Sequence, residues 1–126
     1  MIKKNRVLIV DDSAVMRKIV ERSLRLAGVE LENVLEANDG WEALALARET
    51  RADLVLCDIN MPGMDGLEFV RQLGSLENGR GVPVVMITTE AGQGRVGEAF
   101  SCGARGYIRK PFTPDQIREQ VAPLLA

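Results

Sequence analysis

The sequence predicts an α/β domain in which helices cover both faces of a doubly wound parallel sheet. Short β-branched runs alternate with longer amphipathic stretches, and this alternation repeats about five times along the chain. Three of the runs, at 6–10, 54–57 and 84–87, are apolar at successive residues, as is typical of strands buried on both faces. A chain of 126 residues is long enough for one hydrophobic core and too short for two. We therefore expect one domain over residues 1–126.

Five strands are expected from these runs, and each ends close to a polar residue or a turn signal. The predicted strands cover residues 6–10, 33–36, 54–57, 84–87 and 106–109.

Helices are expected between the strands. Apolar residues from Val15 to Leu24 recur at spacings of three and four, and Gly28 follows them as a stop signal. The alanine- and leucine-rich stretch 39–49 predicts a second helix, and a third begins at Leu67.

The last two helices carry opposite signals at their starts. In the fifth, Thr113 fits the N-cap, Pro114 the first helical position and Gln116 the third, which together form a capping box. The fourth has glycines crowded at its start, each costing about 0.8–1 kcal/mol relative to alanine inside a helix. It should therefore begin late, near Arg95, or be marginally stable; the glycines are Gly92, Gly94 and Gly97.

The composition excludes several classes of protein. Hydrophobic residues make up 46% of the chain and charged residues 27%, which is ordinary for a globular domain. A net charge of -2 offers no basic excess for nucleic-acid binding by this domain, and apolar runs of four or five residues are too short to span a membrane. The absence of histidine excludes an imidazole base and a His-ligated zinc. Cys57 and Cys102 lie far apart in no metal-ligand pattern, which favours a reducing, cytoplasmic location.

Polar residues follow four of the predicted strands, at the sheet edge where parallel folds bind ligands. They are Asp11 and Asp12 after the first strand, Asp58 after the third, Thr88 and Thr89 after the fourth, and Lys110 after the fifth. Taken singly, each could be a helix cap, a turn residue or a solvated surface residue. Together they predict a functional site. Like charges about 4 Å apart repel by about 4 kcal/mol at an effective dielectric near 20, and a purely structural role gives no reason to tolerate that loss of stability.

A divalent cation would explain such a cluster, and an all-oxygen site with few ligands suits Mg²⁺. The same residues suggest phosphoryl transfer. A carboxylate can attack phosphorus to form an acyl phosphate while a cation and a lysine neutralise the phosphoryl oxygens. Such a nucleophile is already ionised and needs no histidine base.

Five stretches in order carry a resemblance that covers essentially the whole chain: VLIVDDSAVMRKIV, ANDGWEAL, DLVLCDINMPGMDGLEFV, PVVMITTEA and GARGYIRKPF. The chain resembles the receiver domains of response regulators, most closely the chemotaxis regulators of the CheY type. The resemblance implies a flavodoxin-like, CheY-like fold with five helices and the strand order 2-1-3-4-5.

The resemblance also implies roles for the site residues. Asp58 would be the phosphoacceptor. Asp12 and Asp58 would ligate Mg²⁺ through their carboxylates, Asn60 through its backbone carbonyl and Asp11 through a water molecule. The glycines and proline near Asp58 make a tight loop plausible, which would turn the Asn60 carbonyl toward the metal.

The remaining implied roles concern the phosphorylated state. Lys110 would pair with the phosphoryl oxygens, Thr88 would move to hydrogen-bond one of them, and Tyr107 would then change rotamer. Asn60 and Glu90 would tune the lifetime of the phosphorylated state. The peptide bond between Lys110 and Pro111 would be cis.

The function implied is a phosphorylation-activated switch of a two-component system. A histidine kinase would donate the phosphoryl group, and the face formed by the fourth helix, fifth strand and fifth helix would bind a target such as a motor switch or an output protein. Such a domain is not an enzyme with an external substrate, although it would catalyse its own phosphotransfer and dephosphorylation.

Alternatives share the fold class. The chain could be a receiver excised from a larger regulator with a separate output domain. A flavin-binding carrier would need a neutral, hydroxyl-rich phosphate loop where this chain has DDSAV, and a metal-dependent phosphohydrolase would need a second aspartate two residues after its nucleophile. Away from these residues, Met61 and Met64 are expected to pack in the core and Trp41 to join the helix–sheet interface.

Overall fold

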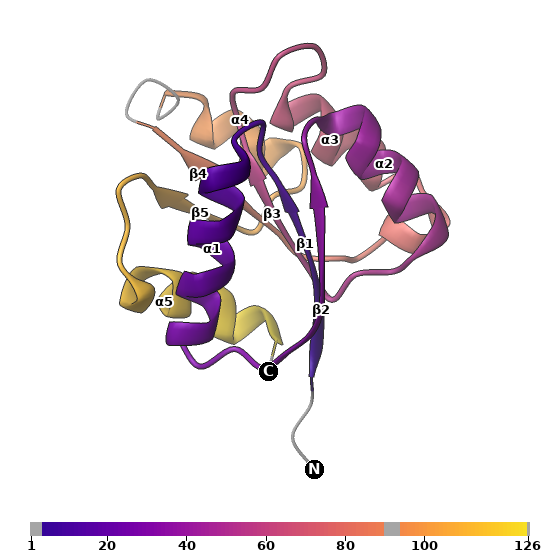
Figure 1. The fold of residues 1–126 in the computed structure, drawn as a ribbon. Helices are drawn as coiled ribbons and strands as arrows, with labels where there is room; N and C mark the ends of the chain where they lie inside the picture. The colour runs from indigo at the N-terminus through magenta and orange to yellow at the C-terminus, as the bar shows by residue number, and fades with distance from the viewer. Residues whose placement is uncertain (1–3, 90–93, 126) are drawn as a thin grey trace.

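Five parallel strands form one sheet in the order β2-β1-β3-β4-β5 in the computed structural model, which describes residues 4–89 and 94–125. Helices connect successive strands (Figure 1). The elements in chain order are β1 (Asn5–Val10), α1 (Ala14–Leu26), β2 (Leu31–Ala37), α2 (Gly40–Glu49), β3 (Leu54–Asp58), α3 (Gly66–Leu73), the 3-10 helix η1 (Glu77–Gly79), β4 (Val84–Thr88), α4 (Val96–Ser101), β5 (Gly106–Arg109) and α5 (Pro114–Leu125). The predicted fold class and strand order are confirmed.

The sheet separates two hydrophobic clusters, because side chains alternate across a strand. In β1, Val7 and Ile9 face the cluster under α1 and α5, whereas Leu8 and Val10 face the cluster under α2, α3 and α4. Figure 1 shows α1 and α5 on one side of the sheet and α2 and α3 on the other. Burial on both faces explains why the central strands are apolar at every residue.

The helices begin where the sequence provides a cap. Ser13, Asp39 and Asp65 each accept a hydrogen bond from a backbone N–H in the first turn of α1, α2 and α3, respectively. At α5, the backbone N–H of Gln116 donates to Thr113 Oγ1 and the Thr113 N–H donates to Gln116 Oε1, at 3.2 and 2.8 Å. The predicted capping box is therefore confirmed.

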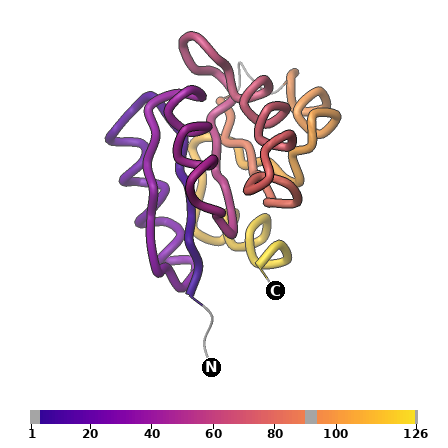
Figure 2. Tube along the Cα trace, turned by 90° about the vertical axis from the view of Figure 1, so that its right-hand side faces the viewer, coloured from indigo at the N-terminus to yellow at the C-terminus, as the bar shows by residue number. Residues whose placement is uncertain are grey.

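The fourth helix is the shortest of the five described, with six residues from Val96 to Ser101. It begins late, directly after Arg95, as the nearby glycines predicted, and no side chain of the described residues caps it. Gly92 lies outside the described residues. Figure 2, turned by 90°, shows α4 beside α3.

None of the helices within 4–89 and 94–125 has the length and apolar content needed to cross a membrane.

Candidate functional site

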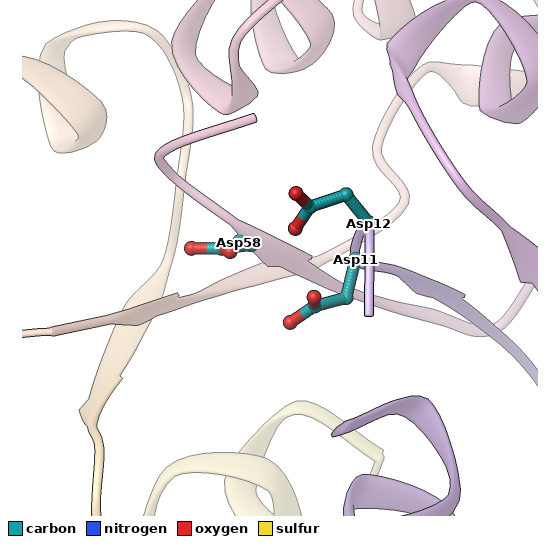
Figure 3. Close-up of side chains that lie close together, drawn as sticks. All are labelled: Asp11, Asp12 and Asp58. Atoms are coloured by element: carbon teal, nitrogen blue, oxygen red, sulfur yellow. The ribbon is translucent and has the colours of Figure 1, made fainter. Parts of the chain in front are cut away.

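Three carboxylates meet at the carboxyl ends of β1 and β3, which are neighbours in the sheet. Asp11 and Asp12 follow β1, and Asp58 is the last residue of β3. One oxygen of each lies within 4.8 Å of the others, and all three carboxylates point to the same side (Figure 3). Asp11 and Asp58 are buried and Asp12 is exposed. The predicted convergence of these residues is confirmed.

Lys110 joins this cluster from the end of β5. Its Nζ lies 3.1 Å from Asp11 Oδ2 and 3.5 Å from Asp58 Oδ2, and its side chain is only 15% exposed. Its backbone N–H donates to the Thr88 carbonyl at 2.7 Å, which holds the start of the β5–α5 connection against β4. The peptide bond between Lys110 and Pro111 is cis, as the resemblance implied.

The electrostatic balance of the cluster is negative, because Lys110 brings one positive charge against three carboxylates. Burial raises the pKa of Asp58, and the nearby Asp11 carboxylate raises it further. The Lys110 ammonium and the Asn60 N–H oppose this shift without reversing it. The single Lys110 charge therefore does not compensate the ionised Asp58 carboxylate and its acidic neighbours. Carboxylate oxygens at this spacing fit a hard divalent cation.

Ser13 caps α1, and neither Asp11 nor Asp12 does. The Met16 N–H donates to Ser13 Oγ at 3.2 Å, while the Ser13 N–H donates to Asp11 Oδ1 at 2.8 Å. The other oxygen of Asp11, Oδ2, accepts a hydrogen bond from the Lys110 ammonium. The cap is thus supplied by the serine, which leaves the two carboxylates directed to the site.

The loop after Asp58 is held in a tight turn by Gly66. The Gly66 N–H donates to the Ile59 carbonyl at 2.8 Å, and a Cβ at position 66 would overlap the Asp58 carbonyl oxygen. Gly63 has a φ of 75°, a conformation that favours glycine. The turn brings the Asn60 N–H within 3.3 Å of Asp58 Oδ1. The tight loop that the glycines predicted is confirmed.

Thr88 and Tyr107 lie on the adjacent strands β4 and β5. Thr88 is fully buried, and its hydroxyl donates to the Thr89 carbonyl at 2.9 Å. Tyr107 is half-buried and meets the Phe100 ring edge-on, with centroids 6.4 Å apart. Glu90, the other residue expected here, lies outside the described residues.

Three residues near the site were not predicted. Arg17 bonds the Asp11 carbonyl, and Arg95 bonds Asp65 and Asn60. The capping role of Asp65 could have been read from the pattern Asp65-x-x-Glu68. The contacts of the two arginines could not, because their charged partners, Glu36 for Arg17 and Asp65 for Arg95, lie 19 and 30 residues away in sequence.

The prediction for Trp41 is wrong. Its side chain is 63% exposed, because α2 turns Ala43, Leu44 and Ala47 toward the sheet and leaves position 41 outside. The indole Nε1 instead lies 3.7 Å from the position that a Cβ of Gly63 would take. Met61 and Met64 are buried in the core, as predicted.

The fold and the acidic edge of the sheet together define a class of signalling domain. A family model described as the response regulator receiver domain matches residues 7–122. The chain belongs to this family. Receiver domains of the CheY type are signalling proteins that histidine kinases phosphorylate and that act on downstream targets.

Curated relatives are chemotaxis proteins. The chain is 40% identical over 119 residues to chemotaxis protein CheY-3 of Vibrio cholerae, a match that covers 94% of this chain and 90% of that protein. It is 39% identical over 123 residues to chemotaxis protein CheY1 of Helicobacter pylori, covering 95% and 96%. These matches favour neither a flavin carrier nor a phosphohydrolase.

Solved structures agree with this assignment. CheY4 of Vibrio cholerae superposes with a TM-score of 0.85 at 37% identity, covering 98% of this chain and 100% of that chain. The receiver domain of a sensor histidine kinase from Pseudomonas aeruginosa superposes with a TM-score of 0.83 at 29% identity, covering 98% of each chain. That structure has a magnesium ion coordinated in its active-site cleft.

Proposed function

We propose that residues 1–126 act as one receiver domain in which Asp58 accepts a phosphoryl group from a histidine kinase. The observation that carries this proposal is the position of Asp58. It ends a buried strand, 3.5 Å from the Lys110 ammonium and beside two further carboxylates. That arrangement stores unfavourable charge in a small domain, which a purely structural role would not require.

The reaction follows from the groups at this edge. A carboxylate oxygen of Asp58 attacks phosphorus, the bond from phosphorus to the donor nitrogen breaks, and the imidazole of the kinase keeps the electron pair and takes up a proton. Lys110, which contacts Asp58 already, pairs with the phosphoryl oxygens. Hydrolysis by water returns the free carboxylate. The domain thus catalyses its own phosphotransfer and dephosphorylation.

Mg²⁺ is the cofactor that we propose for this edge. Asp12 and Asp58 would hold it through their carboxylates, Asn60 through its backbone carbonyl and Asp11 through a water molecule. When bound, the ion neutralises phosphoryl charge that Lys110 alone cannot balance. The three carboxylate oxygens within 4.8 Å of one another support this assignment.

The switch would run from Thr88 to Tyr107. We propose that the Thr88 hydroxyl leaves the Thr89 carbonyl to bond a phosphoryl oxygen and that Tyr107 then changes rotamer. Asn60 and Glu90 would tune the lifetime of the phosphorylated state. The half-exposed Phe100, whose ring meets Tyr107, makes the surface of α4, β5 and α5 responsive to this change and supports its use as the output face.

The partners that we propose are a histidine kinase and a target such as a flagellar motor switch or another output protein. The names of the curated relatives support a role in chemotaxis. The cytoplasmic location stays a prediction.

Labelling with acetyl phosphate tests the acceptor. The wild type should gain one phosphoryl group by intact mass, and Asp58→Asn should gain none because an amide is not a nucleophile toward phosphorus. Asp115→Asn, an exposed position on α5, is the control and should label like the wild type. Undiminished labelling of Asp58→Asn would contradict the assignment.

Thermal unfolding tests the metal. Millimolar Mg²⁺ should raise the melting temperature of the wild type because binding to the folded state stabilises it. Asp12→Asn should melt higher than the wild type without Mg²⁺, since one repulsive charge is gone, and should respond less to the ion. Equal responses of both proteins would argue against this set of ligands.

A further inference from the structure

Arg95 reaches from the start of α4 to the loop that follows the phosphoacceptor. Its Nη2 lies 2.7 Å from Asp65 Oδ2, and its Nη1 lies 3.3 Å from Asn60 Oδ1. The arginine and aspartate side chains are 37% and 33% exposed. One guanidinium at the start of α4 therefore holds two groups of the β3–α3 loop, and no side chain of the described residues caps this helix.

Both partners of Arg95 are anchored at their other ends. Asp65 Oδ1 accepts the Glu68 N–H at 3.0 Å and so caps α3, which leaves Oδ2 for the arginine. The backbone N–H of Asn60 donates to Asp58 Oδ1 at 3.3 Å. Arg95 therefore contacts Asn60, which in turn contacts the proposed phosphoacceptor Asp58.

The guanidinium also fixes the orientation of the Asn60 amide. Arginine has donors and no acceptor, so it selects the amide oxygen and turns the amide nitrogen elsewhere. Asn60 is exposed, and its backbone N–H lies on the Oδ1 side of Asp58, whereas the Lys110 ammonium lies on the Oδ2 side. The exposed Asn60 side chain therefore starts from the Oδ1 side of the acceptor, opposite the largely buried Lys110.

We infer that Arg95 is a positioning residue that prolongs the life of the phosphoryl group on Asp58, an inference that rests on the proposed function. Arg95 holds the Asn60 side chain on the Oδ1 side of the acceptor, where that side chain restricts the approach of the hydrolytic water. Asp65 supplies the fixed point for the guanidinium. Without this hold, the Asn60 side chain rotates freely and water reaches phosphorus more often.

The test follows the decay of the phosphoprotein. Each protein is labelled with acetyl phosphate and Mg²⁺, the donor is removed, and the remaining phosphoprotein is measured by intact mass over time. Arg95→Ala should lose its phosphoryl group roughly fivefold faster than the wild type, which corresponds to about 1 kcal/mol. Asp65→Asn keeps a residue able to cap α3 but loses the ionic anchor, and should shift the rate in the same direction.

Two further variants separate positioning from a general effect on structure. Arg95→Lys keeps the charge but loses the planar fork, so its rate should fall between those of the wild type and Arg95→Ala. Arg95→Ala combined with Asn60→Ala should decay no faster than Asn60→Ala alone, because the arginine acts through the asparagine.

Arg71→Ala is the matched control. Arg71 lies on α3 and contacts Cys102 Sγ at the end of α4 at 3.1 Å, while its bond to Glu68 at 2.8 Å stays within α3. Among the described residues it has no hydrogen bond or ion pair to the loop that follows Asp58. This variant should decay at the wild-type rate. If it decays as fast as Arg95→Ala, the effect belongs to the α3–α4 contact in general and the inference fails.

The outcomes distinguish this inference from the proposed function. Normal labelling of Asp58 with an unchanged decay in Arg95→Ala overturns the role of Arg95 and leaves the phosphoacceptor in place. Faster decay that persists in the Asn60→Ala background also overturns it. Failure of the wild type to label at all overturns both.

Discussion

Two arginines flank the acidic cluster, and they are held in different ways. Arg17, on α1, bonds the Asp11 carbonyl at 2.7 Å, Glu36 at 3.0 Å and Asn38 at 2.8 Å, and its side chain is 11% exposed. We call this side the Arg17 flank and the opposite side, formed by Arg95, Asp65 and Asn60, the Arg95 flank. The Arg95 side chain is more than three times as exposed.

The difference teaches which side of the site is fixed. A buried guanidinium must keep its partners, because removing one leaves a charge without compensation. A half-exposed ion pair breaks at little cost, because water replaces the lost partner. The helices match this division, since α1 has 13 residues and a Ser13 cap whereas α4 has six residues and no side-chain cap among the described residues. The Arg17 flank therefore holds Asp11 by contacts that are costly to break, whereas the Arg95 flank holds Asn60 by a more exposed contact that costs less to break.

The largest effect is expected on the Arg17 flank. Arg17→Ala should lower the free energy of unfolding by about 2–3 kcal/mol, because it leaves the Asp11 carbonyl without its charged donor and leaves Glu36 paired with Lys18 alone. Urea unfolding measures this loss. Lys18→Ala is the control, since Lys18 also pairs with Glu36 at 3.0 Å but is 68% exposed, and it should cost much less than Arg17→Ala. Equal losses would mean that burial of the Arg17 side chain does not make its contacts costlier to break.

The second effect concerns Gly66, which follows Asp65 of the Arg95 flank and packs against the backbone of Asp58. Gly66→Ala should lower the free energy of unfolding by about 1–3 kcal/mol, because the added Cβ meets the Asp58 carbonyl and α3 must shift away from β3. Gly74→Ala, at the other end of α3, adds a Cβ at ordinary contact distance and is the control. A Gly66→Ala protein as stable as the control would mean that the loop after Asp58 adapts freely.

A stabilising change is expected in α4. Gly97→Ala should raise the free energy of unfolding by about 0.5–1 kcal/mol, because alanine loses less entropy in a helix and its Cβ enters open space. Gly28→Ala also enters open space, but Gly28 has a φ of 89°, so this control should destabilise the protein. If Gly97→Ala gains nothing in thermal or urea unfolding, this glycine does not limit the stability of α4.

The smallest effect is a pH dependence on the Arg17 flank. The Lys18 hydrogen bond lowers the pKa of Glu36, and Arg17 contributes to the shift, while burial opposes both. Because the folded-state pKa lies below the unfolded one, this stabilisation is complete above the ordinary glutamate pKa of about 4.3 and is lost as the pH falls through the lowered value. The stability difference between the wild type and Glu36→Gln should therefore shrink on acidification. A constant difference across urea titrations at successive pH values would contradict the shift.

Much of this fold follows from local sequence signals. β5 spans residues 106–109 as predicted, and the late start of α4 and the capping box of α5 follow from single glycine, threonine and glutamine positions. β2 runs from 31 to 37 and so is longer than the predicted 33–36. Its added residues include exposed Glu32, and an edge strand of this kind has no continuous apolar run to mark its ends.

The site also contains contacts that the sequence predicts and contacts that it does not. Convergence of Asp11, Asp58 and Lys110 was predictable, although 99 residues separate Asp11 from Lys110, because parallel strands end at a common edge. The contacts of Arg95 were not predictable, because they depend on the side-by-side packing of α3 and α4. Trp41 was misjudged because its place near the start of a predicted helix does not show which face of α2 it occupies.

The exposed position of Trp41 gives this protein an optical probe of its own. The indole lies against Gly63, in the loop that leads from Asp58 to Asp65, and the chain has no second tryptophan. Indole emission depends on the polarity and the quenching groups around the ring. A movement of that loop therefore changes the fluorescence of a single, naturally placed reporter, so that its motion can be followed without attaching a dye.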